Sequence, residues 1–292
     1  MDKGQEILRR LETIHNLPTL PVVITKLREA ISNPNADAKK IAQIIEDDPS
    51  MMARILKVVN SALYRGRQDV TSLQMAVARM GFNAISNIAM STTIFSIFKS
   101  SGPTGFSHED FWRHSICVGI GADVLYERCK GSLSKRYTAD ILQLSGLMHD
   151  IGKIVLEQFF HASFRQAVAL SVEEEIPLCD AERKVMGVDH AEIGAVLAQR
   201  WHLTPDFAHV IRWHHKPMSI NINEDYSELI RLCHTADYIC NLERIGDGGN
   251  VTAPSFDQKV WGSLGLSVGD ISEIVDAIKE QSAHSEVLMA FV

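Results

Sequence analysis

Apolar side chains recur at intervals of three and four residues along most of this 292-residue chain. This spacing places them on one face of an α-helix, and it is clearest in residues 22–31, 41–45, 51–60, 84–98 and 267–281. Alternation of apolar and polar residues, which is typical of a half-buried β-strand, is not sustained in any segment. The sequence therefore predicts an all-α protein.

Short motifs mark where some of these helices begin and end. Asp48 and Pro49 interrupt the pattern, and a new helix follows them. Ser72 precedes another helix, and Gly81 follows its last apolar residue as a predicted C-cap.

The best candidate for a domain boundary is the small, polar stretch of residues 99–105, which is rich in Gly and Pro. It divides the chain into an N-terminal helical subdomain, residues 1–100, and a C-terminal helical subdomain, residues 101–292. We expect the first bundle to pack on the second. Residues 244–250 form a second predicted loop, too short to be assigned as a linker.

Composition argues against several classes of partner. The net charge is −7 and no Lys/Arg cluster occurs, so a nucleic-acid-binding surface is not expected. No apolar run approaches the roughly 20 residues of a membrane span, and the start of the chain lacks a signal-peptide core. The five scattered cysteines form no C-x-x-C pair and are expected to be reduced core residues. We therefore expect a cytoplasmic protein.

Imidazole and carboxylate groups recur through the second half of the chain. Several predicted helices could direct one or two of them to a common centre, as helical-bundle metal proteins do. An adjacent His–Asp pair can face one divalent ion. The candidates, in chain order, are Asp110, His114, His149, Asp150, Lys153, His190, His214, His215 and Asp237.

Each candidate also has an ordinary structural interpretation. A histidine on an apolar helix is more often a packed, hydrogen-bonded core residue than a ligand. Asp110 could be a first-turn acid that the helix N-terminus stabilises. Lys153 could simply be solvated.

The ordered series resembles the HD superfamily of metal-dependent phosphohydrolases, and HDIGK at residues 149–153 with the later double histidine resembles its HD-GYP branch. Four motifs of the first half resemble the HDOD domain, a relative known from bacterial signalling proteins. They are LPTLP at 17–21, IIEDDP at 44–49, ILKVVNSA at 55–62 and AVARMG at 76–81. The HDOD resemblance covers about residues 17–217, and it implies that the C-terminal subdomain is HD-like.

This resemblance implies a metal site and the role of each donor. His114, His149, Asp150 and Asp237 would form a first metal position, with Asp150 able to bridge. A second position would use His190, His214 and His215, and Asp110 would join from the His114 helix. Such mixed ligands suit one or two transition-metal ions, iron or manganese above all. Lys153 would stabilise phosphoryl oxygens, and with Asp150 it would be a catalytic residue.

Two functions are then open. HD-GYP enzymes follow the double histidine with a Gly-Tyr-Pro loop, whereas this chain continues Lys216-Pro217-Met218-Ser219, which argues against hydrolysis of cyclic di-GMP. Most HDOD domains act as noncatalytic signalling modules that have lost part of the metal set, whereas this chain keeps nearly all of it. We favour a signalling module that binds an unidentified protein partner, and the alternative is an active phosphohydrolase on a nucleotide or other phosphoester.

Overall fold

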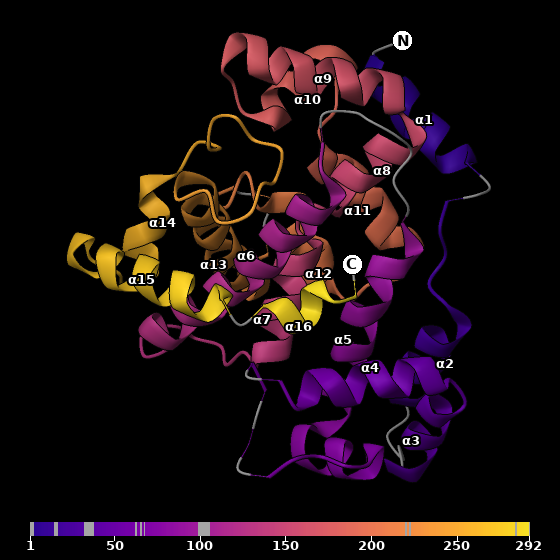
Figure 1. Ribbon diagram of the computed structural model, residues 1–292. Coiled ribbons are helices and arrows are strands. Elements are labelled where there is room, and N and C mark those ends of the chain that lie inside the picture. The colour runs from indigo at the N-terminus through magenta and orange to yellow at the C-terminus, as the bar shows by residue number, and fades with distance from the viewer. Residues whose placement is uncertain are drawn as a thin grey trace. The chain divides into compact units, whose positions relative to one another are not determined.

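The computed structural model describes residues 3–14, 17–31, 38–61, 63–64, 66, 68–98, 106–219, 221, 223–283 and 285–291 (Figure 1). Every regular element among these residues is a helix, and none of them forms a strand. The prediction of an all-α fold is confirmed. None of the helices in this part of the chain combines the length and the apolar character that a membrane crossing requires. The predicted linker at residues 99–105 lies outside the described residues.

The helices group into two compact units, of which one comprises residues 18–98 and 283–292. Its helices are α2 (Val22–Ile31), α3 (Ala38–Glu46), α4 (Pro49–Val59), α5 (Leu73–Ile97) and α16 (Glu286–Met289). Fully buried side chains at the predicted apolar positions, such as Ile24, Ile41 and Ile55, form its core. The Asp48 side chain accepts a hydrogen bond from Met51 N and so begins α4 as predicted.

Gly81 ends a helical segment, as its predicted role as a C-cap requires, but the next segment follows it at once. Its backbone has φ 81° and ψ 168°, so α5 consists of two helical segments joined at a kink. A glycine adopts this positive φ without the strain that a side chain would add. The Ser72 side chain begins the first segment by accepting a hydrogen bond from Met75 N.

The other unit comprises residues 1–17 and 99–282. Its helices are α1 (Lys3–Thr13), α6 (His108–Cys129), α7 (Ala139–Met148), α8 (Ile151–Phe159), α9 (His161–Glu174), α10 (Leu178–Met186), α11 (His190–Arg200), α12 (Pro205–Trp213), α13 (Glu224–Leu242), α14 (Gln258–Ser263), the short 3₁₀ helix η1 (Val268–Asp270) and α15 (Ile271–Ser282). The last long helix is expected from residue 267, but it begins at Ile271. In the turn before it, the Asp270 carboxylate accepts hydrogen bonds from Ser267 N and Oγ.

Residues 1–17 belong to the unit that consists mainly of the C-terminal part of the chain. Residues 283–292 belong to the unit that consists mainly of the N-terminal part. α1 packs on α10 and α11, with Gly4 close to the Gly187 carbonyl, whereas α16 packs on α4. The division of the chain at residues 100 and 101 stays a proposal. The five cysteines are all buried and free, as expected.

Two close contacts between helices, α6 with α7 and α8 with α11, help to position the C-terminal half around a common centre. α6 packs against both α7 and α13, and α8 packs against α11 (Figure 1). A Cβ at Gly146 would lie 2.1 Å from Gly119 N, and one at Gly152 would lie 1.9 Å from the His190 carbonyl oxygen. Backbone therefore meets backbone at both contacts, and no larger residue fits there.

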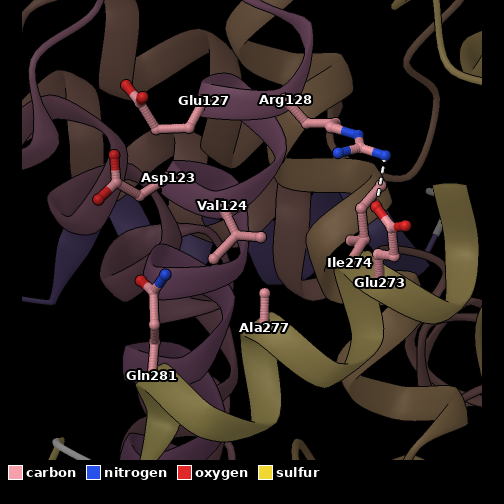
Figure 2. Close-up of a pocket in the computed structure, with 8 residues that line it drawn as sticks. All are labelled: Asp123, Val124, Glu127, Arg128, Glu273, Ile274, Ala277 and Gln281. Atoms are coloured by element: carbon pink, nitrogen blue, oxygen red, sulfur yellow. Dashed lines mark hydrogen bonds and ion pairs between the residues drawn. The ribbon is translucent and has the colours of Figure 1, made fainter.

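An open hollow of about 380 Å³ lies between α6 and α15 (Figure 2). Arg128 forms an ion pair with Glu273 at 2.6 Å, while Asp123 and Glu127 lie away from that pair. None of the sequence-predicted site residues lines this hollow.

Candidate metal centre

The sequence-predicted donors come from five places in one unit. His114 lies on α6, His190 is the first residue of α11, and Asp237 lies on α13. The other donors stand where helices end: His149 and Asp150 lie between α7 and α8, and His214 and His215 directly follow α12. Helix ends can direct adjacent side chains to one point because the chain leaves the helical path there.

The first group of converging donors consists of His114, His149, Asp150 and Asp237, all of them buried. His114 Nε2 lies 3.1 Å from Asp237 Oδ1. His149 Nε2 lies 3.2 Å from Asp150 Oδ2 and 3.5 Å from Asp237 Oδ1. These four residues are the ones that the family resemblance assigns to a first metal position.

The second group shares Asp150 with the first and adds His190, His214 and His215. Asp150 Oδ1 lies 2.9 Å from His190 Nε2 and 3.3 Å from His214 Nε2. His215 Nε2 lies 2.8 Å from His190 Nε2. The two oxygens of Asp150 thus face different groups, which is the arrangement that a bridging carboxylate needs.

Hydrogen bonds fix which ring nitrogen of three histidines carries the proton. His149 Nδ1 donates to the Gly146 carbonyl at 2.6 Å, and His214 Nδ1 donates to the Ile211 carbonyl at 3.0 Å. His190 Nδ1 donates to Glu182 Oε2 at 2.6 Å. Nε2 of each ring points into the cluster, and it is the nitrogen that would lose its proton and offer a lone pair when a metal ion binds.

Glu182 is the main functional candidate that the sequence reasoning missed. Its side chain is completely buried on α10, and Oε2 accepts a second hydrogen bond, from His190 N, at 2.8 Å. A signal for it exists in the sequence, because Leu178, Ala181 and Met186 place Glu182 on the apolar face of a helix. A buried carboxylate behind a ligand orients the ring and raises its basicity.

Several inward-facing atoms have no satisfactory hydrogen bond. His149 Nε2, His214 Nε2 and Asp150 Oδ1 are buried without one, although each faces another donor or acceptor of the cluster. Unpaired buried polar atoms are costly and are rare in native proteins. Because these atoms belong to imidazoles and a carboxylate, the cluster fits a transition-metal ion.

The electrostatics of the cluster favour a cation. Burial would raise the pKa of Asp150, but His149 and Lys153 hold that pKa well below its ordinary value. Burial would lower the pKa of His149, yet Asp150 and Asp237 raise it to about 10. Burial is the main reason that the pKa values of His214 and His215 are lowered. Asp150 and Asp237, whose pKa is also held well below its ordinary value, are therefore ionised, and His214 and His215 are neutral.

Lys153 contacts the cluster through its ammonium group. The Lys153 side chain is completely buried. Its Nζ donates to Asp150 Oδ2 at 2.6 Å and to the Gly248 carbonyl at 2.8 Å. The interpretation of Lys153 as a solvated residue is thereby excluded, and its charge lies where it holds Asp150.

Two further polar residues lie outside both groups. Asp110 is exposed in the first turn of α6, where an acid is stabilised by the helix N-terminus, and it does not converge with the donors. His234 is buried, and its Nδ1 donates to the His214 carbonyl at 2.7 Å. His234 therefore holds the segment that carries the double histidine.

Comparison with known proteins agrees with this architecture. Residues 17–217 match the model of the HDOD domain. An uncharacterised protein of Treponema pallidum (strain Nichols) is 28% identical over 219 residues, which are 75% of this chain, and the chain spans 41% of the length of that relative.

Three solved structures share the fold over nearly the whole chain. An HDOD domain protein of unknown function from Geobacter sulfurreducens has a TM-score of 0.77 at 24% identity and covers 98% of this chain and 97% of its own. A protein of Shewanella amazonensis SB2B, provisionally named a phosphohydrolase, has a TM-score of 0.73 at 22% identity. The match covers 99% of this chain and 98% of that protein. A protein of Marinobacter aquaeolei VT8, provisionally named a signal transduction protein, has a TM-score of 0.72 at 22% identity. The match covers 99% of this chain and 65% of that protein. With a family match over more than half of its length and an all-helical fold shared with these structures, this chain belongs to the HDOD domain family.

Proposed function

We propose that this protein is a signal-transduction module of the HDOD type that carries a metal centre and binds a protein partner. The observation that carries the proposal is the burial of six of the seven donors: His114, His149 and His214 are completely buried, Asp150, His190 and Asp237 are at most 2% exposed, and His215 is partly exposed. A catalytic centre must admit a substrate to its ions, whereas a structural or sensory centre needs no such opening. The family's association with signalling supports the same choice.

The donor set supports iron or manganese, in one or two ions. Imidazole and carboxylate ligands together suit these borderline ions better than calcium, which prefers oxygen ligands alone. Asp150 belongs to both groups, so it would bridge two ions, and Glu182 would hold His190 in place. When bound, such ions attract phosphate oxygens and lower the pKa of a coordinated water.

An active phosphohydrolase is the second candidate, and the position of Lys153 favours it. Its buried ammonium lies 2.6 Å from the carboxylate that both groups share, where it could stabilise phosphoryl oxygens during transfer. The Shewanella amazonensis relative named for that activity has the same fold. The substrate would be a phosphoester other than cyclic di-GMP, since the Gly-Tyr-Pro loop is missing from the sequence.

Elemental analysis of the purified protein tests the metal centre. The wild type should contain iron or manganese, and the double variant His149→Ala/Asp150→Ala should contain neither. The matched control is His202→Ala/Asp180→Ala, which removes an exposed residue of each type. Metal content that survives the first double variant would return the cluster to a packing role.

A hydrolysis assay separates the two candidate functions. Cyclic and linear nucleotides would be incubated with the metal-loaded protein, and the signalling module should release no product above the level of the His149→Ala/Asp150→Ala variant. Turnover that this variant abolishes would establish the phosphohydrolase instead.

A further inference from the structure

The two groups of donors differ in their access to solvent. All four members of the first group are buried, whereas the second group includes His215, which is partly exposed. Because the groups share Asp150, this difference comes from what covers the remaining donors on each side.

Residues 244–250, here named the glycine loop, cover the first group. A Cβ at Gly248 would lie 2.8 Å from His114 Cδ2 and 3.0 Å from His114 Nε2, and one at Gly246 would lie 2.5 Å from His114 N. The loop backbone therefore lies directly on the imidazole. Glycine permits this contact because no side chain separates the loop from the ring.

Hydrogen bonds fasten the glycine loop along its length. The Gly248 carbonyl accepts from Lys153 Nζ at 2.8 Å, and Asp247 N donates to the Asp110 carbonyl at 3.2 Å. Asn250 Oδ1 accepts from Leu178 N at 3.1 Å, and Asn250 Nδ2 donates to Asn241 Oδ1 at 3.1 Å.

Asn241 continues this chain of bonds into the first group. Its Nδ2 donates to Asp237 Oδ1 at 2.6 Å. The loop is thus tied to donor residues through Lys153 on one side and through Asn241 on the other. Moving it breaks several bonds together.

We propose that the glycine loop seals the first metal position, so that its ion exchanges slowly, while the ion at the second position exchanges with solvent beside His215. The inference rests on the proposed metal centre and adds to it a division of roles. The sealed ion stabilises the fold, and the open position is where the metal content of the protein responds to its surroundings.

Metal release to an excess of EDTA tests this division. The metal-loaded wild type should lose two ions in two phases of equal size, with the slow phase at least about tenfold slower than the fast one, because the loop must open first. His215→Ala should remove the fast phase and keep the slow one.

Two loop variants test the seal itself. Gly248→Ala crowds His114 and should speed the slow phase by about tenfold or more, because overpacking destabilises the closed loop relative to the open one. Gly262→Ala is the matched control, since a Cβ there meets nothing within 4 Å. Asn250→Ala loosens the loop without adding atoms near His114, and it should speed the slow phase even if Gly248→Ala does not fold.

Each outcome decides the inference. Two ions released at one rate, or a slow phase that neither loop variant changes, would overturn the seal and leave the metal centre intact. A single slow ion that the loop variants accelerate would support the seal, and a single ion that leaves quickly would overturn it. Protein without metal would overturn the metal centre and the seal together.

Discussion

Replacing Glu182 by Gln should weaken metal binding without unfolding the protein. Glu182 is completely buried, and its Oε2 accepts from His190 N at 2.8 Å and from His190 Nδ1 at 2.6 Å. Glutamine keeps the shape and one acceptor oxygen, so both bonds can persist with neutral character. The change therefore removes charge from behind the ligand and leaves the packing in place.

The size of this effect follows from the two hydrogen bonds. A bond to a charged group contributes about 1.5–3 kcal/mol and a neutral one about 0.5–1.5 kcal/mol, so each bond loses about 1 kcal/mol. Only the part of this loss that differs between the metal-bound and the metal-free protein lowers the affinity, and the usual loss for a group that orients a ligand is about 10–100-fold. The loss should fall on the ion that His190 binds.

Competition with a fluorescent chelator at a fixed pH measures this affinity. Glu174→Gln is the matched control, because that glutamate is exposed and pairs with Lys184 away from the cluster. Circular dichroism and urea unfolding should show that both variants fold. If the folded Glu182→Gln variant binds metal as tightly as the wild type, the claim that Glu182 orients a metal ligand is wrong.

Three further predictions concern the same unit. Gly152→Ala places a Cβ 1.9 Å from the His190 carbonyl oxygen and should lower the free energy of unfolding by about 3 kcal/mol or more, while Gly262→Ala changes it little; equal urea midpoints would contradict this. Burial, with a smaller repulsion from Glu127, raises the pKa of Asp123 from 3.8 to about 6, so this carboxyl group destabilises the fold progressively as pH rises between those values. Asp123→Asn should therefore stabilise the protein by about 1–2 kcal/mol at pH 7.5 and by nothing below pH 3.8, and a gain that is independent of pH in urea unfolding would refute the assignment. Any phosphoesterase activity should fall about tenfold or more in Lys153→Met with metal still bound, and equal turnover in variant and wild type would remove Lys153 from the mechanism.

The fold could be predicted from the sequence because its helices bury apolar faces at regular intervals. Ile24, Ile41 and Ile55 occupy such positions and are completely buried. The grouping of the chain ends could not be predicted in this way. It depends on contacts between distant segments, such as that of Gly4 with the Gly187 carbonyl, and helical periodicity carries no information about them.

The convergence of the donors could be anticipated only through the family resemblance. Spacing alone shows that Asp110 and His114 share a helix face, yet only His114 points to the cluster, because Asp110 lies one turn nearer the exposed helix start. Glu182 and the Gly248 carbonyl escaped prediction for different reasons. The apolar positions around Glu182 indicate that it is buried, but they do not show that it contacts His190, and a backbone carbonyl leaves no trace in residue type.

Anomalous X-ray scattering from crystals of the wild-type protein, recorded at the iron and manganese absorption edges, tests the central claim most directly. The account predicts two peaks about 3.5–4 Å apart on either side of the Asp150 carboxylate, one beside His114 and His149 and the other beside His190 and His214. A map with no anomalous peak within bonding distance of Asp150, from protein grown and purified with these metals present, would contradict it.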